Sequence, residues 1–169
     1  MPQIFPRLRG DRRFWRPVDG LYFQYRRPED IAAVCNRCGA RFAFKADLTK
    51  THEFDETSGG YRVLRGAVEG AISGRGGCTK CGKIVKTLSW PDDAFFKVRV
   101  PEGTVWAWNE LYLPALRARV AGDKTSLRHL TMESADLIRF VARLPRYAVL
   151  GKNRAHLVAE LDRLQQSEG

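Results

Sequence analysis

Four cysteines in two matching pairs are the residues of this sequence best suited to chemistry. Each pair has the form Cys-x-x-Cys-Gly, at residues 35–39 and 78–82. Two residues between the cysteines let one tight turn direct both sulfurs at the same ion, and the following glycine can adopt a positive φ. Four thiolates form the tetrahedral set that zinc prefers and leave no coordination position open. The pattern predicts one structural zinc ion held by Cys35, Cys38, Cys78 and Cys81.

The cysteine pairs resemble the knuckles of the zinc-ribbon class, in which two such turns on β-hairpins clamp one ion. The resemblance covers about residues 31–90 and is to the class in general. It implies a β-rich fold that the metal holds together. The sequence departs from a minimal ribbon because 39 residues separate Cys38 from Cys78. This spacer is therefore expected to carry structure of its own.

Two other uses of four cysteines stay open on the sequence alone. An iron–sulfur cluster is also held by four thiolates. A thioredoxin-like redox site uses one Cys-x-x-Cys pair, normally at the start of a helix in a βαβ unit. Here there are two pairs in β-rich surroundings, and the ligand chemistry favours zinc over both alternatives.

The positive charge of the chain is concentrated in its first ninety residues. The formal net charge is +10, and residues 1–90 account for +8 of it. Such a basic half indicates a polyanionic partner, and nucleic acid is the commonest one. However, 21 of the 29 basic residues are arginine, which a GC-rich genome would produce without selection for binding. Charge alone therefore leaves the partner open.

Arginines alternate with aromatic residues before residue 28. Stacking side chains beside cations are typical of surfaces that bind single-stranded nucleic acid, although alternating aromatics on a strand are also typical of a core. Four thiolates and one Zn²⁺ form a unit of formal charge −2, which the cations next to the cysteines can balance. The N-terminal arginines lack that explanation. The predicted nucleic-acid contacts, mainly to phosphates, are Arg7, Arg9, Arg12, Arg13, Arg16, Arg26 and Arg27.

The remaining residues divide into strand-like and helix-like stretches. Alternating apolar residues predict strands over residues 21–25, 31–34, 41–45 and 83–90, and a hairpin over 94–100 and 104–108. The polar residues 49–56 can pair back as a hairpin arm. The glycine-rich residues 59–77 predict a loop or short helix followed by a strand into Cys78. Asn109, Thr131 and Asn153 are predicted to cap three helices. Pro114 falls inside the first helix and is expected to kink or delay it; that helix ends near Gly122, and Pro145 ends the second.

Strands followed by helices indicate an α+β protein. The predicted organisation is an irregular basic arm at residues 1–20, a β-rich zinc-ribbon domain at 21–108 and a helical C-terminal region at 109–169. The last two parts can form one continuous domain. No apolar run is long enough to cross a membrane and no secretory signal is present, so the cytoplasm is the expected location.

Outside the cysteines the sequence offers no convincing catalytic group. His52, Glu53 and Asp55 could be drawn as a metal-dependent nuclease cluster, but their spacing fits a solvated hairpin tip better. No serine or cysteine nucleophile stands beside a base, and a small-molecule substrate is not expected. The favoured function is a non-enzymatic structural-zinc protein that binds nucleic acid through its basic N-terminal half. The alternatives are a protein–protein interaction adaptor or accessory subunit and, more remotely, a metal-dependent nuclease.

Overall fold

Strands form the first part of the described chain and helices the last part, which confirms the α+β class. The computed structural model describes residues 27–47, 52–63, 70–132, 134–142 and 144–167. The strands are β1 (Asp30–Val34), β2 (Arg41–Ala46), β3 (His52–Asp55), β4 (Gly60–Val63), β5 (Ala71–Gly77), β6 (Ile84–Ser89), β7 (Lys97–Val100) and β8 (Gly103–Trp106). The helices are α2 (Leu113–Ala121), α3 (Lys124–Met132), α4 (Ala135–Val141), α5 (Arg146–Val149) and α6 (Gly151–Gln166).

The largest sheet is antiparallel and has the strand order β1-β2-β5-β6. Along β2, Phe42, Phe44 and Ala46 are buried, while Ala43 and Lys45 are exposed. This period of two follows from the pleat of the strand, which places alternate side chains on opposite faces. The predicted strands at 31–34, 41–45 and 83–90 are confirmed by β1, β2 and β6. The predicted strand at 21–25 lies outside the described residues.

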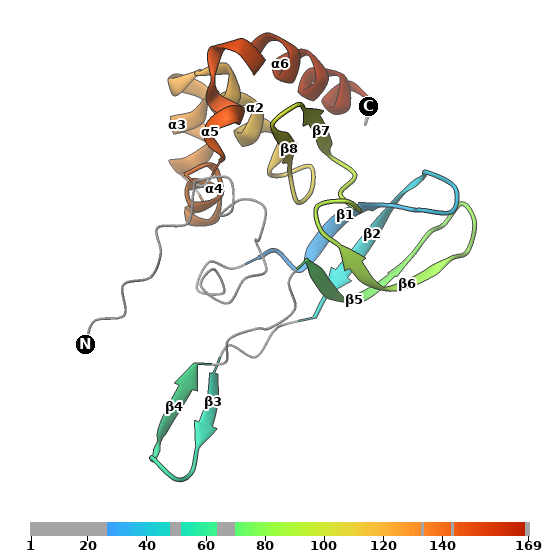
Figure 1. Cartoon of the computed structure of the whole chain (residues 1–169), viewed down its shortest axis with the longest axis vertical. Coiled ribbons are helices and arrows are strands. Elements are labelled where there is room, and N and C mark those ends of the chain that lie inside the picture. Colours follow the sequence, from blue (N-terminus) through green and yellow to red (C-terminus); the bar gives the residue numbers. More distant parts are fainter. Residues whose placement is uncertain (1–26, 48–51, 64–69, 133, 143, 168–169) are drawn as a thin grey trace.

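A second hairpin, β3–β4, lies apart from the large sheet (Figure 1). It confirms a hairpin arm at the end of residues 49–56. The prediction of a loop or short helix after residue 59 is wrong for residues 60–63, which form β4. The reason is antiparallel backbone pairing across the turn, from Asp55 with Gly60 to His52 with Val63, because a ladder can outweigh the low strand propensity of a glycine-rich segment. The strand predicted to enter Cys78 is confirmed by β5.

Aromatic side chains join the sheet to the helices. Trp90 stacks on Trp108 with ring centroids 4.7 Å apart, and Trp106 meets both rings edge-on. Phe140 of α4 packs against Trp106 and Tyr112. The buried residues from β1 to α6 form one continuous hydrophobic cluster, and the β7–β8 hairpin lies between the large sheet and the helices (Figure 1). The predicted hairpin at 94–108 is confirmed by β7 and β8.

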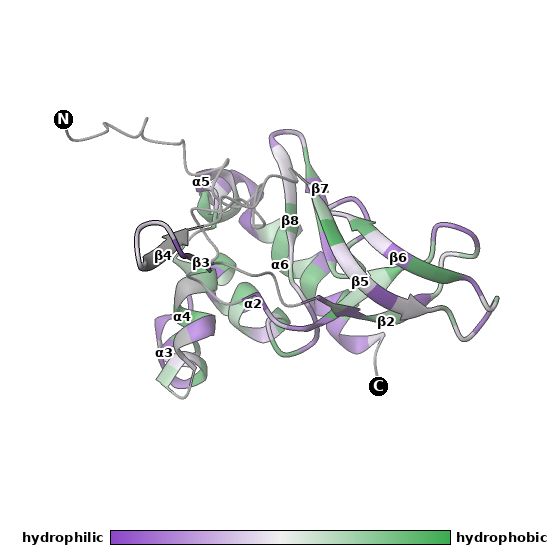
Figure 2. Cartoon of the chain, turned by 90° about the horizontal axis from the view of Figure 1, so that it is seen from below, coloured by the Kyte–Doolittle hydropathy of each residue, from purple (hydrophilic) through white to green (hydrophobic). Residues whose placement is uncertain are grey.

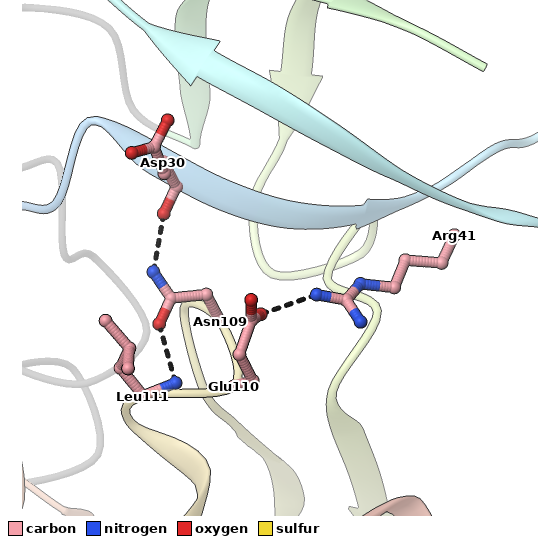
Figure 3. A network of polar contacts seen from close by, with 5 residues as sticks. All are labelled: Asp30, Arg41, Asn109, Glu110 and Leu111. Atoms are coloured by element: carbon pink, nitrogen blue, oxygen red, sulfur yellow. Dashed lines mark hydrogen bonds and ion pairs between the residues drawn. The ribbon is translucent and has the colours of Figure 1, made fainter. Parts of the chain in front are cut away.

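A polar link reinforces this junction at the start of the helical region (Figure 3). The Asn109 side chain donates to the carbonyl oxygen of Asp30 at 2.7 Å and accepts from the N–H of Leu111 at 3.0 Å. Arg41 on β2 forms an exposed ion pair with Glu110 at 2.5 Å. Such an exposed pair contributes at most about 1 kcal/mol, so the buried Asn109 amide is the stronger tie between β1 and the chain leading to α2.

All three predicted helix caps are wrong. The N-cap position of α2 is Tyr112 and not Asn109, and no side chain among the described residues caps that helix. Thr131 lies inside α3, where its hydroxyl donates to the carbonyl of Leu127; Ser134 instead caps α4 by accepting from the N–H of Leu137. Asn153 lies within the first turn of α6, and its amide donates to Glu102 and to the carbonyl of Tyr147.

The first helix was predicted more accurately. It begins at Leu113, with Pro114 in its first turn, so of the kink or delay expected from Pro114 the structure shows the delay. It ends at Gly122, which adopts a φ of 76°. The apolar stripe expected for the last helix is confirmed, since Leu157 and Leu161 of α6 are fully buried. No helix within the described ranges has both the length and the apolar character needed to cross a membrane.

Candidate metal centre

The first cysteine knuckle is the turn between β1 and β2. The N–H of Cys35 donates to the carbonyl of Ala40 at 2.8 Å, which closes the hairpin. Inside the turn the N–H of Gly39 donates back to the carbonyl of Cys35 at 2.7 Å. Gly39 has a φ of 73°, a region that side chains with a Cβ rarely enter. The glycine of the motif therefore meets a real backbone requirement.

The second knuckle, between β5 and β6, repeats this backbone. Cys78 bonds to the carbonyl of Lys83 at 2.9 Å, and Gly82 donates to the carbonyl of Cys78 at 2.8 Å. Gly82 has a φ of 69°. Because β1-β2 and β5-β6 are hairpins of one sheet joined by the β2–β5 ladder, both turns lie at the same end of that sheet.

The four sulfurs meet at that end. All four Sγ atoms lie within 4.8 Å of one another. Across the two knuckles, the Sγ atoms of Cys35 and Cys81 are 3.6 Å apart, and those of Cys38 and Cys78 are 3.5 Å apart. A tetrahedron with metal–sulfur bonds of about 2.3 Å has sulfur–sulfur edges of about 3.8 Å. The group therefore has the size of one tetrahedrally coordinated ion.

Backbone N–H groups of the first knuckle point at its sulfurs. The N–H of Arg37, opposed by burial and helped by the N–H of Cys38, lowers the pKa of Cys35 to about 6. Cys38 accepts from the N–H of Ala40, but burial and the neighbouring thiols, that of Cys78 first, raise its pKa to about 11. Hydrogen bonds of this kind favour thiolate, while four thiols this close cannot all ionise unless a cation joins them.

The second knuckle orients its amides in the same way. The N–H groups of Cys81 and Lys80 lower the pKa of Cys78, with burial opposing them. The donors thus come from the positions two and three residues after the first cysteine of each knuckle. Such bonds fix the sulfur positions and help to disperse negative charge on a metal-bound thiolate. The sequence predicted that amides of each knuckle can bond to the sulfurs, but not which amides would do so, because backbone amides carry no residue-type signal.

The four cysteines are largely shielded from solvent. Cys35 and Cys78 are 1% and 2% exposed, and Cys38 and Cys81 are partly buried against the core. The Lys83 ammonium donates to the Asn36 side chain and so ties the two knuckles together. No local pattern indicates this contact, since 47 residues separate its partners. Four sulfurs in this arrangement could hold one ion and leave it no position for a substrate.

The redox alternative fits this geometry poorly. A reactive Cys-x-x-Cys pair lowers its pKa at the start of a helix, whereas both pairs here lie in β-hairpin turns. A disulfide also needs sulfurs about 2.05 Å apart, and all four cysteines are free thiols. The sulfur contacts of 3.6 and 3.5 Å each join the two knuckles, so the arrangement favours joint coordination over pairing within a motif.

Of the arginines predicted to contact nucleic acid, Arg27 alone falls in the described residues. Its guanidinium donates to the carbonyl of Asp47 at 2.8 Å, and burial lowers its pKa while Asp47 opposes that change. Arg27 therefore holds the chain just after β2. The other six, which lie outside the described residues, are Arg7, Arg9, Arg12, Arg13, Arg16 and Arg26.

The residues of the histidine cluster lie on a strand and not at the hairpin tip where they were expected. His52, Glu53 and Asp55 lie along β3, with His52 paired to Val63, and the tip of the hairpin is at residues 56–59. The expected hairpin tip is therefore displaced by a few residues. The side chains of β3 lie outside the described set, within which the four cysteines form the single group suited to a metal.

Searches of family models, curated proteins and solved structures return no match to this chain. The likeness to zinc ribbons therefore rests on the two Cys-x-x-Cys-Gly turns and on the sulfur geometry.

Proposed function

We propose that this is a non-enzymatic protein built around one structural zinc ion, and that it binds nucleic acid through its basic N-terminal half. The observation that carries the proposal is the meeting of four cysteine sulfurs within 4.8 Å at the end of one sheet. Soft thiolate ligands in a tetrahedral set select zinc among the common divalent ions. An iron–sulfur cluster is less favoured, because its several metal and sulfide atoms need more room between the cysteines.

The charge of the described sheet supports a polyanionic partner. Residues 27–47 and 70–100 carry ten basic side chains against five acidic ones. A tetrathiolate zinc unit of charge −2 offsets part of this excess and leaves a positive surface. Two of the cations, Arg37 and Lys80, occupy equivalent positions at the tips of the two knuckles and are exposed. Lys45 and Arg75 are also exposed and oppose each other across the β2–β5 ladder.

These cations suit phosphates better than bases. Like charges directly opposite each other in a sheet are unfavourable, and an anion between Lys45 and Arg75 would relieve that repulsion. Glu29 approaches Lys45 at 3.8 Å and compensates it in part. The large apolar side chains that the described surface exposes are aliphatic, so it offers no aromatic platform for bases. We assign any stacking on bases to the aromatic residues between positions 14 and 25.

The nucleic-acid proposal predicts salt-sensitive binding with a dominant role for the N-terminal arginines. In a fluorescence anisotropy titration with labelled 20-mers of single-stranded RNA and of single- and double-stranded DNA, we expect Kd values of roughly 1–100 μM at low salt. Replacing Arg12, Arg13 and Arg16 by alanine should weaken binding at least about tenfold and reduce the salt slope by about 2. The matched control replaces three exposed helical arginines, Arg128, Arg146 and Arg154, and should change binding little.

The same titration can reject the proposal. Absence of binding to every 20-mer at about 50 mM salt, with protein near 100 μM, would rule out nucleic acid as the partner. If both sets of substitutions weaken binding equally, the protein still binds nucleic acid, but the N-terminal arginines are not its specific binding site. The zinc part of the proposal would survive either result.

A further inference from the structure

Of the two edge strands of the large sheet, β1 is covered by backbone hydrogen bonds with other segments, whereas β6 is not paired on its outer side within the described residues. The outer edge of β1 is covered by backbone hydrogen bonds: Ala32 donates to Trp108, Phe95 donates to Ala32, and Val34 donates to Asp93. The other edge is β6. Within the described residues no strand pairs with its outer side. An uncovered edge strand presents a row of backbone donors and acceptors to any chain that reaches it.

The register identifies which backbone groups of β6 point outward. The N–H of Trp90 donates to the carbonyl of Gly70, so Leu88 faces β5 as well and its neighbours face outward. Ser89 is already satisfied, because its N–H and carbonyl both bond to Asp93. Thr87 points outward and has no such partner among the described residues.

The pairing of β5 with β6 shifts register by one residue between Ser73 and Gly76, so the end of β6 next to the metal centre has its own alternation. Lys83 faces β5 through its bond to Cys78, so Ile84 points outward there. The unused edge therefore runs from Ile84 to Thr87 and stops at Ser89. It is about four residues long, which is enough for a short segment of added strand.

A groove runs beside this edge. It has a volume of about 240 Å³ and lies between β6, the end of β1 and the loop after β6. Val34 and the buried side chains of Phe42 and Leu88 line its floor, and the neighbouring apolar side chain of Ile84 is 71% exposed. Along β5 and β6 hydrophobic and hydrophilic positions follow one another (Figure 2). The edge thus combines free backbone groups with apolar contacts for alternate side chains.

The charges around the groove are unequal along its length. Lys83 and Lys86 line it on the β6 side, and Asn36 lies beside them. The single carboxylate, Asp93, lies at the far end and accepts from the N–H of Ser89. A ligand that follows β6 therefore meets two ammonium groups toward the zinc knuckles.

We infer that the outer edge of β6 binds an extended acidic segment of a partner protein by adding it as a fifth strand. Backbone bonds to Ile84 and Thr87 supply affinity, and alternate side chains of the segment enter the groove. Carboxylates of the segment pair with Lys83 and Lys86. This surface is separate from the proposed nucleic-acid contacts of the N-terminal arginines and does not depend on them.

Two other occupants fit the edge less well. In a second copy paired through β6, the lysines of the two strands would face each other, and lysine on an edge strand is a common device against such pairing. Nucleic acid would bring phosphates to a backbone edge where half of the groups are carbonyl oxygens. It would also meet Asp93 and the apolar surface of Val34 and Phe42. An acidic polypeptide satisfies the donors, the acceptors and the ammonium groups together.

The test is an NMR titration of the full-length, zinc-loaded protein with two capped octapeptides, one of alternating Glu and Val and one of alternating Lys and Val. We expect the acidic peptide to shift the amide signals of Ile84, Lys86 and Thr87 and the basic peptide to leave them unchanged. Lys86→Glu should weaken the acidic peptide at least fivefold and admit the basic one. The control Arg75→Glu alters an exposed cation on the neighbouring strand and should change neither.

A second variant tests the backbone contribution. Thr87→Pro removes the outward N–H but no bond to β5, so the acidic peptide should bind at least fivefold more weakly while the spectrum of the remaining fold persists. Equal shifts with both peptides, or shifts elsewhere, would overturn the inference. The inference would also be overturned if a single-stranded DNA 20-mer shifts the same amide signals. A dimer seen by sedimentation that Thr87→Pro dissociates would overturn it as well. If the alanine variants of Arg12, Arg13 and Arg16 lose DNA binding but still bind the acidic peptide, the peptide surface is independent of the proposed nucleic-acid function.

Discussion

Cys35→Ser will unfold the four-stranded sheet and abolish metal binding. Cys35 is 1% exposed and its sulfur lies 3.6 Å from that of Cys81, so serine would leave a hard hydroxyl in a set of soft ligands. Structural zinc contributes roughly 10–16 kcal/mol in isolated zinc-finger peptides, comparable to the whole net stability of about 5–15 kcal/mol of an ordinary domain. Circular dichroism and amide exchange of β1, β2, β5 and β6 would measure the loss.

A neighbouring substitution provides the control. Thr79→Ser changes an exposed residue between Cys78 and Cys81 that is not a ligand, and should alter the free energy of unfolding by no more than about 0.5 kcal/mol. Cys81→Ser should behave like Cys35→Ser. If both cysteine variants keep the native amide-exchange protection of the sheet without bound metal, the four sulfurs do not support the fold.

Gly74→Ala will be the most damaging change in the sheet outside the metal centre. A Cβ at Gly74 would lie 2.2 Å from the carbonyl oxygen of Lys45 and 2.6 Å from Cε1 of Phe44. Because the β2–β5 ladder fixes that carbonyl, the two strands must separate. We expect a loss of about 3 kcal/mol or more, measured as a lower urea midpoint, and a melting temperature about 6–12 °C lower.

Gly77 on the same strand is the matched control. A Cβ at Gly77 would meet nothing within 4 Å, so Gly77→Ala should leave stability unchanged or raise it by up to about 1 kcal/mol. Equal destabilisation by the two substitutions would mean that strand entropy, and not the close approach of β5 to β2, decides the glycine requirement.

The meeting of the four cysteines was predictable because its signal is local. Each Cys-x-x-Cys-Gly turn encodes its own geometry through the spacing of the sulfurs and the glycine, and two copies were enough to predict that Cys35 and Cys78 would meet. The hairpins on either side followed from alternation of apolar residues. The glycine-rich spacer was harder, since β5 is specified by contact with Phe42 and Phe44, which lie about thirty residues earlier.

The helix starts show why local patterns failed elsewhere. Asn109 and Asn153 are good capping residues by type, but each is drawn into a long-range contact, with Asp30 and with Glu102 respectively. Thr131 bonds back within its own helix, and the cap falls to Ser134. A side chain with several available partners cannot be assigned from sequence neighbours alone.

The open edge of β6 was also beyond sequence reasoning. Its groove needs the end of β1, the strand β6 and Asp93 to come together, and the order of strands decides which edge is covered. In the sequence, Ile84 is an apolar residue just after a knuckle, and the alternating pattern assigns it to an ordinary strand. Nothing about it indicates that its strand lies at an uncovered edge.

The most direct test of the central claim is the metal content of the native protein. Native mass spectrometry and elemental analysis of protein purified without added metal should give one zinc ion per chain. Removal of the zinc by a chelator should unfold β1, β2, β5 and β6 together, and returning zinc should restore them. A chain that is fully folded and free of metal, or one that holds iron with sulfide in place of zinc, would contradict the account.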